Sequence, residues 1–271
     1  MKRICISVAL LFVLWGELPA QDAAHRRLLE SPRHHEWLEV RYDGRAVQAY
    51  VVYPERPDPA PVVLVIHENR GLTDWVRSVA DRLAEAGYLA VAPDLLSGMA
   101  PGGGGTRDFP DEDAAREAIY RLSPEQVLAD LRAVADRVRR LAASDGRLSV
   151  AGFCWGGTQA FRFATAYPEL QAAFVFYGTA PEDSAALVRI RCPVYAFYGG
   201  ADARVNATVP ATARILQRAG RHFEPVTYEG AGHAFMRTGE GPAASEANRR
   251  AREAAWARWL KLLETHSRRE R

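Results

Sequence analysis

The chain has 271 residues, of which 48% are hydrophobic and 25% are charged, and its formal net charge is +2. A chain of this length and composition can bury a large core and fits one α/β domain. The nearly balanced charge, without a basic stripe interleaved with aromatic residues, argues against a nucleic-acid partner.

The N-terminus has the pattern of an export signal. Lys2 and Arg3 precede an apolar run over residues 4–15, and the small residue Ala20 follows a short helix-breaking stretch. We therefore predict a signal peptide over residues 1–20 and an exported protein of the bacterial periplasm, with no stable membrane insertion after cleavage. The apolar run is shorter than the ~20 residues that span a bilayer. An uncleaved membrane anchor is the alternative.

The predicted sheet begins after a polar leader, residues 21–36. Residues Trp37–Tyr42 and Ala46–Tyr53 alternate in polarity around an Asp-Gly turn, which predicts two antiparallel strands at a sheet edge. The continuous apolar run Val62–Ile66 then predicts a strand that is buried on both faces.

From this point on, strands and helices alternate along the chain. We expect helices over 73–86, 114–121, 124–143, 159–167, 207–219 and 243–263, and strands over 88–92, 148–151, 173–177, 194–198 and 223–228. This alternation predicts an α/β fold with a mostly parallel sheet, helices on both faces and an antiparallel N-terminal edge. Functional residues are then expected at the carboxyl ends of the strands.

One of these strand ends has the pattern of a nucleophile elbow. The apolar strand stops at Gly152, Cys154 follows, and Gly156 precedes a helical segment. Such a G-x-C-x-G turn lifts the central side chain above the end of a parallel sheet and needs small residues around it. The helix N-terminus favours a thiolate here, and the Trp155 N–H points toward a developing oxyanion. The alternative is a small buried hydrophobic cysteine.

Two further residues follow later strands in an informative order. Asp202 comes after the strand over 194–198, and His233 comes after the strand that ends at Tyr228. Nucleophile, acid and histidine in this chain order are expected of an α/β-hydrolase, where the histidine exchanges a proton with sulfur and the acid fixes its tautomer. Taken singly, the aspartate is equally expected as a turn former or helix cap, and the histidine as a loop residue.

Short motifs at these strand ends occur together. They are His67-Glu68-Asn69-Arg70-Gly71-Leu72, Ala92-Pro93-Asp94-Leu95, Gly152-Phe153-Cys154-Trp155-Gly156-Gly157, Tyr198-Gly199-Gly200-Ala201-Asp202 and Gly232-His233-Ala234-Phe235. With them the chain resembles the dienelactone hydrolase (carboxymethylenebutenolidase-like) family of the α/β-hydrolase superfamily, from about residue 47 to the last helix. We assign residues 37–264 to this domain and residues 265–271 to a charged tail.

The resemblance implies roles that local pattern does not show. In that family, a glutamate matching Glu68 takes the proton of the cysteine when substrate arrives, and the backbone N–H groups matching Asn69 and Trp155 form the oxyanion hole. The alternative for Glu68 is an exposed loop carboxylate. The implied chemistry is acyl transfer: Cys154 attacks an ester or lactone carbonyl, and water then hydrolyses the thioester with His233 as base.

The chain differs from better-known family members in the residues that would bind the substrate. Those members hold a substrate carboxylate with two arginines; Arg237 matches one of them, but Gly98 stands at the position of the other. Arg107, beyond a glycine run, is a candidate substitute, and Phe235 with the loop over 96–110 is expected to set specificity. The alternative for Arg237 is a solvated loop charge.

The function expected from these residues is a cysteine-dependent hydrolase that opens an enol-lactone or activated ester. The alternatives are a broad-specificity carboxylesterase of the cell envelope, a thiol redox or sensor protein that uses Cys154, and a catalytically silent binding module. The absence of a C-x-x-C motif argues against the redox protein. Cys192, just before Pro193, is expected to fill the core, although an exported compartment allows it to pair with Cys154. We expect a small-molecule substrate, no cofactor, no metal and a monomer.

Overall fold

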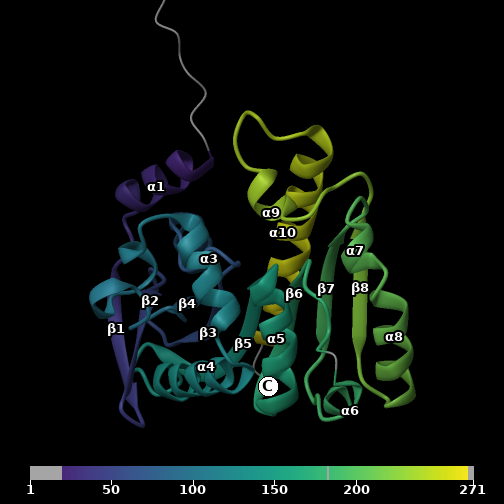
Figure 1. Ribbon diagram of the computed structural model, residues 1–271, viewed down its shortest axis with the longest axis horizontal. Helices are drawn as coiled ribbons and strands as arrows, with labels where there is room; N and C mark the ends of the chain where they lie inside the picture. Colours follow the sequence, from purple (N-terminus) through teal and green to yellow (C-terminus); the bar gives the residue numbers. More distant parts are fainter. Residues whose placement is uncertain (1–19, 182, 268–271) are drawn as a thin grey trace, which may run out of the picture.

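The computed structural model describes residues 20–181 and 183–267 (Figure 1). Its centre is an eight-stranded sheet with the order β1-β2-β4-β3-β5-β6-β7-β8. Only the pairs β1–β2 and β2–β4 are antiparallel, and the other neighbouring strands are parallel. The strands are β1 (His35–Tyr42), β2 (Arg45–Val52), β3 (Ala60–Ile66), β4 (Leu89–Asp94), β5 (Ser144–Phe153), β6 (Leu170–Phe176), β7 (Val194–Gly199) and β8 (Phe223–Tyr228). The predicted fold class is confirmed.

Helices cover both faces of this sheet, as Figure 1 shows for α5 and α10. The α-helices are α1 (Ala20–Glu30), α2 (Asp74–Glu85), α3 (Glu112–Arg121), α4 (Pro124–Val138), α5 (Trp155–Ala166), α6 (Ser184–Leu187), α7 (Ala203–Asn206), α8 (Val209–Arg218), α9 (Phe235–Thr238) and α10 (Glu246–Ser267). The helix expected over 207–219 corresponds to α8 alone. The short helices α6, α7 and α9 were not predicted, because four-residue helices carry too little periodic pattern.

The alternation of side chains along β3 explains why both faces are covered. Val62, Leu64 and Ile66 pack into the core cluster that contains residues of α4 and α5. Val63 and Val65 pack into the cluster on the other face, which contains residues of α2 and α10. Because successive strand side chains point to opposite faces, a strand covered twice must be apolar throughout.

The stretch expected as a polar leader is part of the folded body, which corrects the sequence interpretation of residues 21–36. It forms α1 and continues into β1, and α1 packs on α2. Arg27 and Arg33 both reach Asp81 of α2 at 2.8 Å, and the Asp81 side chain is only 1% exposed. The stretch is polar, but these charges are paired with an aspartate about 50 residues away in the chain.

The predicted signal peptide lies outside the described residues, apart from Ala20, the first residue of α1. At the other end, α10 extends to Ser267, so the start of the predicted tail over 265–271 is helical and residues 268–271 lie outside the described part. Within the described ranges, 20–181 and 183–267, we find no helix that is both long enough and apolar enough to cross a membrane.

The ion pairs of Asp81 should contribute strongly to stability. We expect Asp81→Asn to lower the free energy of unfolding by about 3 kcal/mol, because it leaves the buried Arg33 guanidinium without its charged partner. The control is Glu85→Gln, which removes the exposed partner of Arg27 and should cost less than about 1 kcal/mol. Urea unfolding followed by circular dichroism measures both. Equal losses in the two variants would contradict the buried role of Asp81.

Candidate active site

Cys154 sits at a strained corner between β5 and α5. Its backbone has φ 56° and ψ −117°, an unfavourable conformation for a residue with a side chain. A hydrogen bond from the Cys154 N–H to the Phe176 carbonyl, at 3.0 Å, stabilises this corner. It is also so tight that a Cβ on Gly152 would lie 2.0 Å from the Gly156 carbonyl oxygen, and a Cβ on Gly156 would lie 2.2 Å from the His67 carbonyl oxygen. Because the backbone segments approach so closely, no side chain fits at either position, and both residues must be glycine.

The three residues predicted after the ends of strands, Cys154, Asp202 and His233, form one hydrogen-bonded chain. His233 Nε2 lies 3.1 Å from Cys154 Sγ, and His233 Nδ1 lies 2.5 Å from Asp202 Oδ2. The acceptor carboxylate places the imidazole proton on Nδ1, so the Nε2 lone pair faces the sulfur. Asp202 also caps α7 by accepting from the Val205 N–H at 3.3 Å. It is thus a helix cap and a histidine partner at once.

Glu68, which follows β3, is buried and paired with Arg237 of α9. Arg237 Nε donates to Glu68 Oε2 at 2.7 Å, and the Glu68 side chain is 6% exposed. The structure therefore does not leave Glu68 as an exposed loop carboxylate. Among the described residues, its second oxygen, Oε1, accepts no hydrogen bond. A buried carboxylate oxygen with no donor is ready to receive a proton or a donor from elsewhere.

The surroundings of Cys154 favour a neutral thiol. Burial of the sulfur and the nearby Glu68 carboxylate raise the pKa of Cys154 to about 11, although the Trp155 N–H, Arg204 and Arg237 oppose this rise. A thiol with this pKa is protonated at neutral pH. The sulfur thus needs a base before it can act as a nucleophile.

Tyr177 is a component of this site that the sequence analysis missed. It directly follows β6, has φ 42°, and packs edge-on against the His233 ring with a centroid distance of 5.1 Å. Its hydroxyl is buried and lies next to the Glu68 carboxylate. Burial and the neighbouring Glu68 carboxylate raise the pKa of Tyr177 well above its usual value. The available signal was its place at a strand end, directly before Gly178.

His67 holds two predicted site residues in position. Its ring is fully buried and stacks on Trp155 with a centroid distance of 5.5 Å. The Leu95 N–H donates to His67 Nε2 at 3.3 Å, so Nδ1 carries the proton and donates to the Glu68 carbonyl at 2.8 Å. Burial lowers the pKa of His67, which keeps the ring neutral. His67 therefore orients the segment that bears Glu68.

A cavity of ≈170 Å³ opens directly beside the sulfur. On one side of it, Asn69 Nδ2 donates to the hydroxyl of Tyr120 at 3.0 Å, which ties the loop after β3 to α3. The residues that line the cavity are Tyr120, Cys154, Trp155, Thr158, Tyr177, Gly178, Thr179, Arg204 and Val205. The cavity has room for a small acyl group next to the Cys154 sulfur.

The other residues predicted to bind substrate lie elsewhere. Phe235 is fully buried between Tyr177 and Tyr228, at ring-centroid distances of 5.4 and 5.2 Å, so it supports the site from below. The Arg107 guanidinium lies 5.6 Å from the ring centroid of Trp37, on the edge strand β1. The structure therefore does not bring Phe235 or Arg107 to the cavity beside Cys154, because both are held by aromatic packing.

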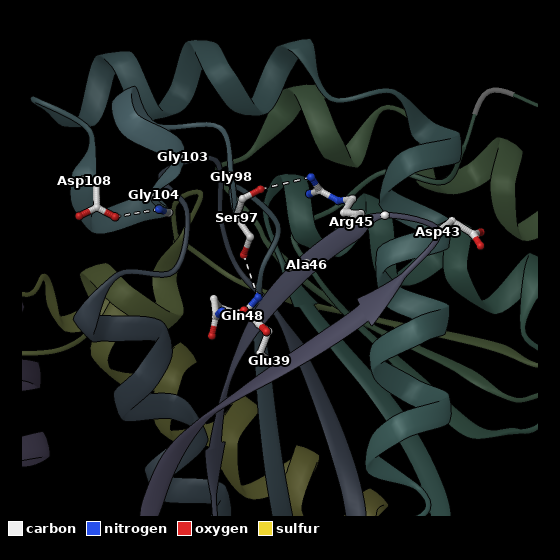
Figure 2. Close-up of a pocket in the computed structure, with 12 residues that line it drawn as sticks. Glu39, Asp43, Arg45, Ala46, Gln48, Ser97, Gly98, Gly103, Gly104 and Asp108 are labelled. Atoms are coloured by element: carbon white, nitrogen blue, oxygen red, sulfur yellow. Dashed lines mark hydrogen bonds between the residues drawn. The ribbon is translucent and has the colours of Figure 1, made fainter.

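Gly98 faces a different cavity, of ≈670 Å³, between the β1–β2 hairpin and the glycine-rich segment after β4 (Figure 2). There the Arg45 guanidinium donates to the Ser97 carbonyl and the Gln48 N–H donates to the Ser97 hydroxyl. None of the residues that line this cavity belongs to the Cys154–His233–Asp202 chain.

In the described residues, no group of three or more His, Cys, Asp or Glu side chains is arranged to hold a metal ion.

The fold and this site define the class of protein. A mostly parallel sheet with a strained strand-to-helix elbow, an acid after a later strand and a histidine after the next is an α/β-hydrolase. Residues 47–267 match the model of the dienelactone hydrolase family, and the chain belongs to that family. The predicted family and the prediction of a carboxylic ester hydrolase are confirmed at this level.

Individual relatives agree with this assignment. The chain is 34% identical over 206 residues to the carboxymethylenebutenolidases of Pseudomonas putida and Pseudomonas knackmussii, which covers 73% of this chain and 84% of each relative. It also superimposes on the crystal structure of a Klebsiella pneumoniae protein described as a dienelactone hydrolase, with a TM-score of 0.73 and 28% identity, over 84% of this chain and 97% of the other.

The raised pKa of Cys154 predicts slow alkylation in the free protein. The rate with iodoacetamide should rise about tenfold per pH unit and level off only near pH 11, because the thiolate fraction limits it. Replacing Glu68 with Gln removes a carboxylate that raises this pKa, so alkylation at pH 7.5 should become roughly tenfold faster.

Peptide mass spectrometry assigns the modified residue, and Cys154→Ala is the control. Cys192 should react little, since it is 6% exposed and burial raises the pKa of its thiol to about 12. A rate that levels off by pH 8, or slower alkylation in Glu68→Gln, would contradict the neutral thiol.

Proposed function

We propose that this protein is a cysteine-dependent hydrolase that opens an enol-lactone or activated ester through a thioester acyl-enzyme. The observation that carries the proposal is the hydrogen-bonded chain from Cys154 Sγ through His233 to Asp202 at a nucleophile elbow. The enol-lactone as substrate is drawn from the names of the carboxymethylenebutenolidase relatives.

The first step generates the thiolate. In the free protein the sulfur is a neutral thiol, and Glu68 is occupied on one oxygen by Arg237. We infer that Glu68, through its unpartnered oxygen, takes the thiol proton when substrate enters the cavity. An anionic group on the substrate that attracted Arg237 would weaken the ion pair and make Glu68 a stronger base.

Acyl transfer then follows at the elbow. The thiolate attacks the carbonyl carbon, and the backbone N–H groups of Asn69 and Trp155 stabilise the oxyanion of the tetrahedral intermediate. Collapse of that intermediate expels an enolate, or the alcoholate of an activated ester, and leaves a thioester on Cys154. His233 deprotonates the water that cleaves the thioester, while Asp202 stabilises the imidazolium that forms.

Leaving-group quality decides which substrates such a site accepts. A thiolate attacks carbonyl carbon readily but is itself a good leaving group, so poor alkoxide and amine leaving groups return the intermediate to the starting ester or amide. This favours enol-lactones and aryl esters over plain alkyl esters. A broad-specificity carboxylesterase is the second candidate, because Gly98 supplies no guanidinium for a substrate carboxylate.

The thiol redox alternative has less support. Cys192 is buried in the core cluster on the face of the sheet that holds α4 and α5, whereas Cys154 packs against the cluster on the other face. Both cysteines are free. The position of Cys192 is that of a core residue, and it offers Cys154 no partner at the site.

Substitutions at Cys154 and Glu68 test the mechanism. We expect Cys154→Ala to lower turnover of both an aryl ester and a carboxylate-bearing enol-lactone by at least about 10³-fold, and Glu68→Gln to lower turnover of the lactone by about 10²-fold. The control Cys192→Ala should keep wild-type rates, and intact mass after mixing with the aryl ester should show one acyl group on wild type and on Cys192→Ala but none on Cys154→Ala.

Each outcome bears on a separate part of the proposal. Unchanged turnover in Cys154→Ala would overturn the mechanism, whereas wild type that cleaves only the aryl ester would overturn the lactone as substrate and favour the carboxylesterase.

We also propose that the enzyme acts in the periplasm, on the basis of the N-terminal sequence pattern. When the full chain is expressed in a bacterium, the protein in the periplasmic fraction should begin near Gln21. Protein that stays with the membranes and retains Met1 would instead support the uncleaved anchor.

A further inference from the structure

The cavity beside Cys154 carries an arginine to which neither the family resemblance nor the mechanism assigns a role. Arg204 lies on α7, two residues after Asp202, and it lines the same cavity as Cys154 and Tyr177. The residue is exposed, and in the described part of the chain no carboxylate lies within ion-pairing distance of its guanidinium. An arginine without a partner at a nucleophile is available to an anionic ligand.

The charge of Arg204 acts at the reacting atom. Burial and Glu68 raise the pKa of Cys154, and Arg204 is among the groups that lower it. Both residues line the same cavity, which places the Arg204 side chain beside the space that a substrate at Cys154 would occupy. A carboxylate bound by Arg204 would therefore lie on a substrate whose carbonyl is already at Cys154.

The other arginines considered for substrate binding already have partners in the free protein. Arg237 is held by Glu68 at 2.7 Å, and the Arg107 guanidinium lies over the Trp37 ring. Gly98 has no side chain and lines the separate cavity near Arg45. Arg204 is the arginine that lines the cavity beside Cys154, and among the described residues it has no ion-pair partner.

The shape of the site leaves room for a substituent beyond the reacting carbonyl. Thr158 and Thr179 line both the cavity beside Cys154 and a neighbouring cavity of ≈410 Å³. The Thr179 N–H donates to the Thr158 hydroxyl at 3.1 Å, which fixes this shared wall. The neighbouring cavity carries both Arg189 and Glu125, so its charge is mixed. Among the described residues that line the cavity beside Cys154, Arg204 is the one with a charged side chain.

We propose that Arg204 binds a carboxylate on the acyl portion of the substrate and so makes the enzyme selective for half-esters of dicarboxylic acids and carboxylate-bearing lactones. The inference rests on the proposed hydrolysis at Cys154. A guanidinium binds a carboxylate through paired, charge-assisted hydrogen bonds, and a neutral acyl group gains nothing from it.

Two aryl esters with the same leaving group test this selectivity: p-nitrophenyl butyrate, which is neutral, and the p-nitrophenyl half-ester of succinic acid. In Arg204→Gln, we expect kcat/KM for the half-ester to fall about tenfold, mainly through KM, while kcat/KM for the butyrate stays within about twofold. Arg204→Lys should retain most of the preference because it keeps the charge. The inhibition constant of free succinate should rise by a similar factor in Arg204→Gln.

The matched control is Arg189→Gln, which removes an exposed arginine from the neighbouring cavity and should leave both esters unaffected. Equal losses on the two esters in Arg204→Gln, or no loss on either, would overturn the role of Arg204 while Cys154-dependent hydrolysis stands. A wild-type protein that hydrolyses neither ester, or a Cys154→Ala variant that hydrolyses both, would instead overturn the proposed function.

Discussion

The site depends on one close backbone contact, between the first turn of α5 and the end of β3. Gly156 lies so near the His67 carbonyl that no side chain fits between them, and Gly152 is equally close to Gly156. This contact fixes the elbow against the segment that bears Glu68. Because the corner at Cys154 is strained, it persists only where the surrounding packing over-determines it. The sulfur and the carboxylate are thereby held on neighbouring, rigid elements.

That rigid placement explains the unusual chemistry of the free site. A helix N-terminus by itself favours a thiolate, whereas the family resemblance implied a thiolate that forms when substrate arrives. In the folded protein, burial and the Glu68 carboxylate outweigh the helix and the nearby arginines, and the thiol stays neutral. A protonated thiol is less prone to oxidation and alkylation than a thiolate. In the proposed mechanism, the reactivity of Cys154 is coupled to substrate binding through the ion pair between Glu68 and Arg237.

Positive charge is distributed around the sulfur on separate loops. Arg237 lies on α9, just after His233, and Arg204 lies on α7, just after Asp202. The segment that carries His233 and the segment that carries Asp202 therefore each bring one guanidinium to the site. These loops extend from the carboxyl ends of β7 and β8, which are fixed by the sheet. A fold of this kind can therefore change its substrate preference by exchanging single loop residues while the hydrogen-bonded chain at the nucleophile stays intact.

The amino-acid sequence by itself determined the alternation of strands and helices, the elbow and the chain order of Cys154, Asp202 and His233. These features depend on local requirements, such as small residues at a tight corner and apolar runs in buried strands. Only the tertiary structure decided that Glu68 pairs with Arg237, 169 residues away, that Tyr177 packs on His233, and that the expected polar leader forms α1 on α2. Ion pairs and burial between distant segments are properties of the assembled chain, and no local spacing encodes them.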